Sequence, residues 1–282
     1  MLFTYTVIVT ILLSVSVHEL GHAYAMRQCG VRIAKIGLLG IPGLGTFRLP
    51  IRSRFFLGTH WYVHPLLIGA YVEPNTDDME KLVRKDALYV YGMGPLANVL
   101  FSLVVMFALG TMTLTFDVAV FAPETIQKWG APGLLIALGI VVAATWYFRR
   151  ILCQLMLLPV GWLLAIFIAY LTWKSGPQIS GISDIIGDIH RARPVMMKAL
   201  PASALNEITM AVKLGAGFSV LLGLVNLLPL VPLDGGHMTR HLFPSRWQSA
   251  YEYASTPIFA LLMLLQFGKD ALNLGHWLWS LL

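Results

Sequence analysis

The chain has 282 residues, of which 57% are hydrophobic and only 12% are charged, and its net charge is +6. A soluble globular domain carries roughly 25% charged residues, so this chain has too few charges to cover a water-exposed surface. The composition excludes a soluble domain and predicts one helical membrane domain over residues 1–282. Basic loops on the cytoplasmic side of a membrane explain the positive charge more simply than a nucleic-acid partner does.

The apolar runs predict an all-α polytopic membrane protein with about six transmembrane helices, since a helix needs about 20 apolar residues to cross a bilayer. The runs lie at about 2–25, 86–113, 131–148, 151–173, 208–232 and 255–277. The Lys269-Asp270 pair interrupts the last run, which could end before it. A cleaved signal peptide is the alternative for the first run, but no basic segment precedes its apolar core.

The segment at about 31–72, between the first two spans, is rich in glycine and proline, which break helices. Short runs with β character, such as 45–49, separate these residues. We expect a small β-hairpin or a re-entrant loop, because irregular backbone at membrane depth survives only against protein or a water cavity. For the more basic stretch 52–64, a plain cytoplasmic loop is an equally weighted alternative.

The distribution of Lys and Arg predicts the orientation of the chain. With the N-terminus outside, thirteen Lys and Arg residues fall on the inner side of the membrane and five on the outer side. Loops that stay in the cytoplasm carry an excess of these residues. We therefore expect a multi-pass membrane protein whose first span ends on the cytoplasmic side.

The most informative motif, His18-Glu19-Leu20-Gly21-His22, lies at the end of the first apolar run. Two histidines four residues apart on a helix share one face and can bind the same metal ion. Glu19 has the position of the general base in zinc peptidases with this motif. Ionisable side chains are costly at the end of a membrane span, so they indicate a functional site.

Catalytic zinc has three protein ligands and one open position, so a third ligand must come from another segment. Asp234 is the candidate, because Pro229 and Pro232 break the preceding apolar helix and allow the carboxylate to turn inward. The span count places the ends of the first and fifth spans and the start of the second on one side of the membrane. The alternative for Asp234 is a turn built on the Asp-Gly pair.

Three motifs together resemble those of the site-2 protease family of intramembrane zinc metalloproteases: HExxH at 18–22, GPxxN at 94–98 and NxxPxxPLDGG at 226–236. The resemblance covers roughly 1–113 and 174–282. It is closest to the bacterial members that cleave anti-sigma factors, which implies a prokaryotic cytoplasmic membrane. Ser175-Gly176-Pro177 matches the segment that precedes their last motif. Those relatives carry PDZ domains, whereas this chain has two apolar runs at about 131–173.

The resemblance implies roles for two further residues. Asn98 and Asn226 would orient the substrate carbonyl or stabilise its oxyanion, and an amide donor suits that task. Hydrogen bonding between membrane helices is the equally weighted alternative for both. His237 and His241 also have the spacing of zinc ligands, but no glutamate accompanies them, and we expect them at the surface.

The expected protein is a zinc metalloendopeptidase with one Zn²⁺, bound by His18, His22 and Asp234, and with Glu19 as catalytic residue. Its expected partners are the lipid bilayer and a single-span membrane protein: an anti-sigma factor, a membrane-bound regulator or a remnant signal peptide. No nucleic-acid partner is expected. A catalytically inactive relative that binds membrane helices is one alternative. A membrane metal transporter is another, although no repeated halves are visible in the sequence.

Overall fold

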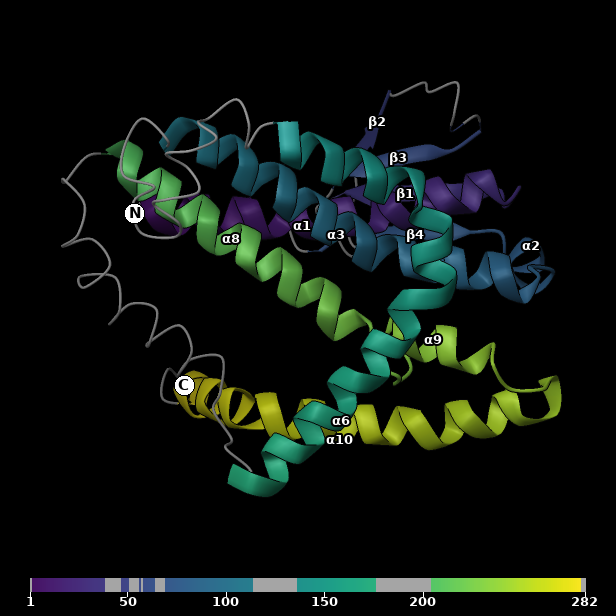
Figure 1. Ribbon diagram of the computed structural model, residues 1–282. Helices are drawn as coiled ribbons and strands as arrows, with labels where there is room; N and C mark the ends of the chain where they lie inside the picture. The colour runs from purple at the N-terminus through teal and green to yellow at the C-terminus, as the bar shows by residue number, and fades with distance from the viewer. Residues whose placement is uncertain are drawn as a thin grey trace.

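Three long helices lie side by side at the centre of the molecule (Figure 1). They are α1 (Leu2–Gln28), α3 (Arg84–Thr113) and α8 (Ala204–Asn226), and each packs against the other two. Small residues let the backbones approach closely, as where Gly215 of α8 lies directly against Thr10 of α1. Such close packing holds helices together in lipid, where no hydrophobic driving force acts between them.

This computed structural model describes residues 2–38, 47–50, 56, 58–63, 69–113, 136–175 and 204–279. Within these ranges, four helices are long and apolar enough to cross a membrane: Tyr5–Gln28, Arg84–Met106, Arg149–Tyr170 and Glu207–Asn226. A further apolar helix, Ile136–Tyr147, is shorter. The protein is mostly helical, as predicted, but the six predicted spans are not confirmed, because four candidate spans are found in the described part of the chain.

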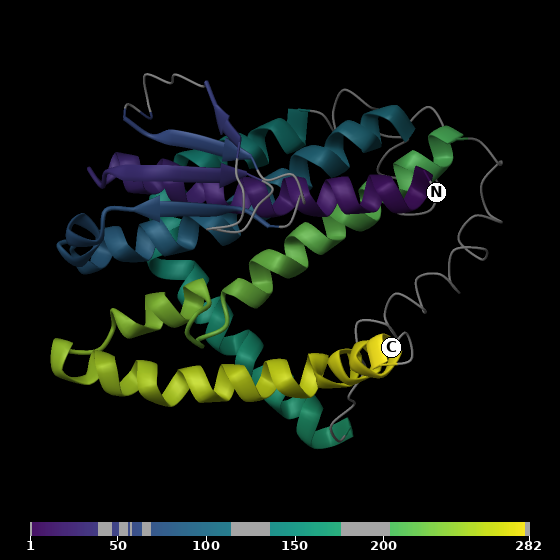
Figure 2. The same ribbon diagram turned by 180° about the vertical axis from the view of Figure 1, so that it is seen from behind.

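The two apolar runs predicted at about 131–148 and 151–173 form consecutive helices that meet at Phe148. Helix Ile136–Tyr147 is followed by α5 (Arg149–Ile151), the π-helix η2 (Leu152–Met156) and α6 (Leu157–Ser175). The chain turns back at this junction, as seen from both sides (Figures 1 and 2). The predicted boundary at Arg149-Arg150 therefore agrees with the structure. Residues 131–135 and the 176–203 segment lie outside the described residues.

The last two predicted spans have different boundaries in the structure. Helix α8 ends at Asn226 rather than at 232, because Pro229 and Pro232 lack the backbone N–H that would continue it. Helix α10 (Ser245–Trp279) begins ten residues before the predicted start and remains helical through positions 269–270. The prediction that Lys269-Asp270 interrupts this helix was wrong, because charged side chains do not prevent a helical backbone.

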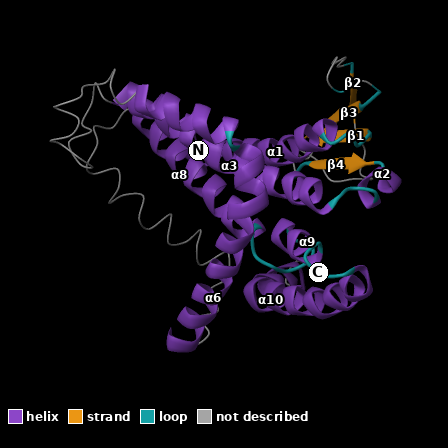
Figure 3. Cartoon of the chain, turned by 45° about the vertical axis from the view of Figure 1, so that its right-hand side comes forward, coloured by secondary structure: helices purple, strands orange, loops and turns teal. Residues whose placement is uncertain are grey.

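A four-stranded sheet packs against the C-terminal end of α1 (Figure 3). Its strands are β1 (Ile33–Leu38), β2 (Phe47–Leu49), β3 (His60–Val63) and β4 (Tyr71–Pro74), in the order β2-β3-β1-β4. The sheet is larger than the expected β-hairpin, although its consecutive strands β2 and β3 do pair antiparallel. Strands β1 and β3 are parallel and need a crossover connection, which no hairpin provides. Strand β3 also replaces part of the plain loop considered for 52–64.

Apolar residues join the sheet to the helices. Ile36 of β1 and Trp61 of β3 are paired neighbours, and both belong to the buried core together with Tyr89 and Met93 of α3. After β4, the short helix α2 (Thr76–Glu80) leads into α3. The sheet is therefore fixed to the end of the helical bundle at which α1 ends and α3 begins.

The turn at 227–233 connects α8 to α9 (Asp234–Arg240). Gly235 has no room for a side chain there, because a Cβ atom would overlap the carbonyl group of Leu227. The turn therefore packs tightly onto the start of α9. This arrangement brings the first residue of α9, Asp234, back against the helical bundle.

Candidate metal centre

Three side chains from distant parts of the sequence meet at one point. His18 and His22 project from α1, one turn apart, and Asp234 projects from the start of α9. The Nε2 atoms of the two histidines are 3.1 Å apart. The Asp234 carboxylate lies 3.0 Å from Nε2 of His18 and 3.2 Å from Nε2 of His22. The structure thus brings together the three ligands predicted from the sequence.

These spacings fit a tetrahedral zinc ion. Ligand atoms about 2.0–2.1 Å from zinc in a tetrahedral arrangement lie roughly 3.3 Å from one another. All three side chains are buried, and Oδ2 of Asp234 accepts no well-aligned hydrogen bond from any described residue, although Nε2 of His18 is close. A cation between the three groups would satisfy all of them at once. The donor set therefore fits the metal.

The outer nitrogen of the His22 ring faces a backbone carbonyl. Nδ1 of His22 lies 2.7 Å from the carbonyl oxygen of Val90 on α3. Because a carbonyl only accepts hydrogen bonds, Nδ1 carries the proton, and Nε2 presents its lone pair to the centre. The sequence motif could not predict this contact, because every residue has a backbone carbonyl and the side chain of Val90 takes no part in it.

Asn98 of α3 is the corresponding neighbour of His18. It is fully buried, and its amide nitrogen lies 3.1 Å from Nδ1 of His18, while its Oδ1 has no hydrogen-bond partner among the described residues. When Nε2 of His18 binds a metal, Nδ1 is protonated and needs an acceptor. A rotation of the amide by 180° places Oδ1 at Nδ1 and removes the unpaired oxygen. Asn98 of α3 therefore makes a hydrogen bond to another helix, and the residue it contacts there is the predicted metal ligand His18.

Glu19 lies beside the three ligands, on the same helix as the histidines. Its partly buried carboxylate interacts electrostatically with His18, His22 and Asp234, and with the backbone of Val72 in β4. The sheet therefore forms a wall of the site on this side. A carboxylate in this position can accept a proton from a water molecule and return it to a leaving group.

Gly94 of α3 provides the space in which the ligands meet. A Cβ atom at this position would overlap Nε2 of His22 and would lie 2.8 Å from Nε2 of His18. The glycine of the GPxxN motif is thus required by the volume of the metal centre. The sequence alone indicated only that the motif was present.

The charge of Asp234 is set by its neighbours. Burial disfavours ionisation, but His22 and His18 hold the pKa of the Asp234 carboxyl below its usual range. The ionised form is the one that binds a metal.

One turn further along α9, the ring of His237 stacks on the ring of Tyr91, with ring centroids 4.9 Å apart, and burial lowers the pKa of His237. His237 is therefore not the surface histidine we expected.

The remaining predicted residues lie apart from the ligands. Asn226, at the end of α8, donates a hydrogen bond to the Leu222 carbonyl at 3.0 Å, within its own helix. No described contact joins its side chain to the ligand group, so its role in substrate binding stays a prediction. His241 lies near Tyr91, with ring centroids 6.0 Å apart, and is not among the three ligands.

A His-His-Asp group with an adjacent glutamate, built into a bundle of apolar helices, defines a membrane protein with a candidate metal centre. The family model described as "Peptidase family M50" matches residues 6–265, and the chain belongs to this family, which is the site-2 protease family. Its members are zinc-dependent metalloproteases, so the family and the donor set indicate the same metal. No curated protein and no solved structure matched the chain.

Proposed function

We propose that the protein is an intramembrane zinc metalloprotease that hydrolyses peptide bonds within or near transmembrane segments. The observation that carries this proposal is the convergence of His18, His22 and Asp234, whose ligand atoms lie within 4.8 Å of one another, beside Glu19 on an apolar helix. A structural zinc site has four protein ligands. Three protein ligands and a neighbouring carboxylate instead suit a catalytic site, with one position open.

The side chains divide the chemistry between them. Zinc held by the three ligands would polarise the substrate carbonyl and make water more acidic. Glu19 takes the proton of the attacking water and passes it to the leaving amine. Val90 and Asn98 hold the two imidazole rings with their Nε2 lone pairs directed inward.

The substrate we propose is a single-span membrane protein, such as an anti-sigma factor, another membrane-bound regulator or a remnant signal peptide, cleaved in regulated intramembrane proteolysis. A transmembrane helix hides its carbonyls in its own hydrogen bonds, so the substrate must unwind locally. An extended segment can then pair with a sheet edge. Strand β4 is an edge strand, and its residue Val72 lies beside Glu19.

We further propose that the protein lies in a prokaryotic cytoplasmic membrane with its N-terminus outside. The sheet and the metal centre would then face the cytoplasm. This orientation follows from the excess of Lys and Arg at that end of the spans. Water for hydrolysis would enter from the cytoplasmic side.

The substitution Glu19→Gln tests the proposed mechanism. The variant should bind one zinc per chain like the wild type, because the three ligands remain. Its cleavage of a single-span substrate in proteoliposomes should fall by about 10²- to 10⁴-fold, the usual contribution of a general base. Zinc content and product formation are the two measurements, and His18→Ala, which should lose both, is the control.

Cleavage at the wild-type rate by Glu19→Gln would remove Glu19 from the mechanism. A zinc-loaded wild type that cleaves none of the single-span substrates would favour the inactive relative. Transport of zinc into the vesicles would instead support the transporter.

A further inference from the structure

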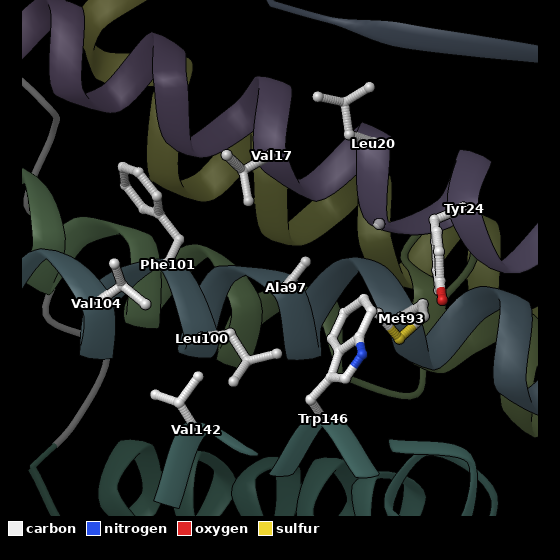
Figure 4. Close-up of a pocket in the computed structure, with 11 residues that line it drawn as sticks. Val17, Leu20, Tyr24, Met93, Ala97, Leu100, Phe101, Val104, Val142 and Trp146 are labelled. Atoms are coloured by element: carbon white, nitrogen blue, oxygen red, sulfur yellow. The ribbon is translucent and has the colours of Figure 1, made fainter. Parts of the chain in front are cut away.

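An apolar groove runs along the helical bundle beside the metal centre (Figure 4). It lies between α1, α3 and helix Ile136–Tyr147 and has a cavity volume of about 430 Å³. Leu20 and Tyr24 line it from α1, and Val142 and Trp146 line it from the short helix. None of the residues that line it is a predicted metal ligand, so the groove is distinct from the metal centre.

The length of the groove suits one hydrocarbon chain. On α3 it extends from Met93 to Val104, a span of eleven helical steps, which corresponds to about 16 Å at 1.5 Å per residue. This length matches one leaflet of a bilayer whose hydrocarbon core is about 30 Å thick.

A cation lies at one end of the groove. The guanidinium of Arg149 stands 4.7 Å from the centroid of the Trp146 ring and 5.8 Å from that of Tyr24. It also donates hydrogen bonds to three neutral oxygens: the Trp146 carbonyl at 2.6 Å, the Tyr89 hydroxyl at 3.3 Å and the Tyr24 hydroxyl at 3.4 Å. These contacts hold the guanidinium in place at the level where Tyr24 and Trp146 close the apolar groove.

The charge of Arg149 is not balanced locally, in contrast to that of its neighbour. Arg150 lies 3.7 Å from the carboxylate of Asp86. No carboxylate of the described residues forms an ion pair with Arg149. Its hydrogen-bond partners are neutral oxygens, so its positive charge is not neutralised, and an oriented guanidinium of this kind is suited to an anionic phosphate group.

We propose that the groove binds an anionic phospholipid, with one acyl chain between the three helices and the phosphate on Arg149. The apolar lining accounts for the chain, and the unbalanced cation at its end accounts for the acidic headgroup. Basic sites between transmembrane helices on the cytoplasmic side recognise anionic lipids in this way. The bound lipid would join α1, which carries both histidine ligands, to the helix Ile136–Tyr147.

The test uses the full-length protein in mild detergent, with phosphatidylglycerol and phosphatidylcholine of identical acyl chains as probes. Native mass spectrometry should show preferential retention of phosphatidylglycerol by the wild type. Arg149→Gln should reduce this retention about fivefold, close to the effect of one basic residue at a membrane surface. Arg150→Gln is the matched control, because it removes the same charge one residue away, and its retention should remain within about twofold of the wild type.

A second variant tests the acyl chain separately. Val142→Trp fills the groove from the short helix and should reduce retention of both lipids, whereas zinc content, which reports the intact bundle, should be unchanged. Equal retention of the two lipids by the wild type would overturn the proposal. So would equal losses in Arg149→Gln and Arg150→Gln, or undiminished retention in Val142→Trp. A dimer that Val142→Trp dissociates would assign the groove to a second copy of the chain and would also overturn it.

Discussion

At the scale of single residues, the metal centre depends on which nitrogen of each histidine carries the proton. The Val90 carbonyl fixes this for His22, because a carbonyl can only accept the Nδ1 proton, and the contact is 2.7 Å long. His18 relies on an amide, which can present either a donor or an acceptor. The state of His18, and hence its competence as a ligand, follows from the orientation of Asn98.

Two substitutions of Asn98 separate these orientations. Asn98→Leu should weaken zinc binding by about 10- to 100-fold, the usual cost of losing a partner of a metal-bound histidine. Asn98→Asp should retain most of the affinity, since a carboxylate accepts the Nδ1 proton. Competition with a chelator of known affinity measures both. If the amide instead donated to His18, the aspartate variant would lose as much affinity as the leucine variant.

Gly94 contributes to the centre through the absence of a side chain. Gly94→Ala should lower zinc affinity by at least about tenfold, as for other changes next to metal ligands, because the added Cβ atom overlaps His22 and presses on His18. Gly217→Ala is the control, since a Cβ atom there meets no atom within 4 Å. Zinc titration of the two variants should show a loss only for Gly94→Ala. Unchanged affinity in Gly94→Ala would contradict the close packing of Gly94 against the ligands.

The ligands were predictable, whereas their supports were not. His18, Glu19 and His22 have a spacing that puts them together on any helix. Asp234 follows two prolines that must end the preceding span. In contrast, Val90 contributes a backbone oxygen and Gly94 contributes space. Neither contribution depends on a reactive side chain, so neither could be predicted from the residue type. Both become visible only when α1 and α3 are placed side by side.

At the scale of elements, the sheet shows the limit of local reasoning. Glycines and short β-type runs predicted extended structure at 31–72, and strands are found there. A hairpin is the simplest pairing of neighbouring runs. The observed order places β1 between β3 and β4, so that β1 pairs with strands remote in sequence. Such long-range pairing is decided by burial of residues such as Ile36 and Trp61, which turn signals do not reveal.

The sheet is held to α2 by an ion pair that responds to pH. Arg32 donates to Asp78 from Nε at 2.7 Å, from Nη2 at 2.9 Å and from its backbone nitrogen at 3.1 Å. Hydrogen bonds from Arg32 lower the pKa of Asp78 to about 2. The unfolded pKa is about 3.9, so the stabilisation is fully present above about pH 4 and is lost as the pH falls through about 2.

The substitution Asp78→Asn should therefore lower the melting temperature of the metal-free protein near pH 6, and the difference from the wild type should shrink below pH 4. Thermal unfolding across this range measures it. Glu73→Gln, which removes the exposed ion pair with Lys35, should have the smaller effect near pH 6. A difference between the wild type and Asp78→Asn that stayed constant down to pH 2.5 would contradict the role of this carboxylate.

At the scale of the whole molecule, composition identified a helical membrane protein, and hydropathy located its main helices. Apolar length does not fix how many helices cross the bilayer, because a buried helix and a spanning helix can have the same composition. Helix Ile136–Tyr147 belongs to a predicted span, but in the described part of the chain it is shorter than a span. The predicted count of five spans before Asp234 placed this residue on the side of His18 and His22. The structure brings the three residues together, although it does not confirm that count.

The proposed orientation can be tested with single cysteines, because the chain has only two of its own, Cys29 and Cys153. In a Cys29→Ser, Cys153→Ala background, Arg48→Cys on the exposed strand β2 should react with a membrane-impermeant maleimide only in inverted vesicles. Glu207→Cys, near the start of α8 at the opposite end of the bundle, should react only in intact spheroplasts (Figure 1). The reverse pattern would place the sheet and the metal centre outside, and water and substrate would then reach Glu19 from the other face of the membrane.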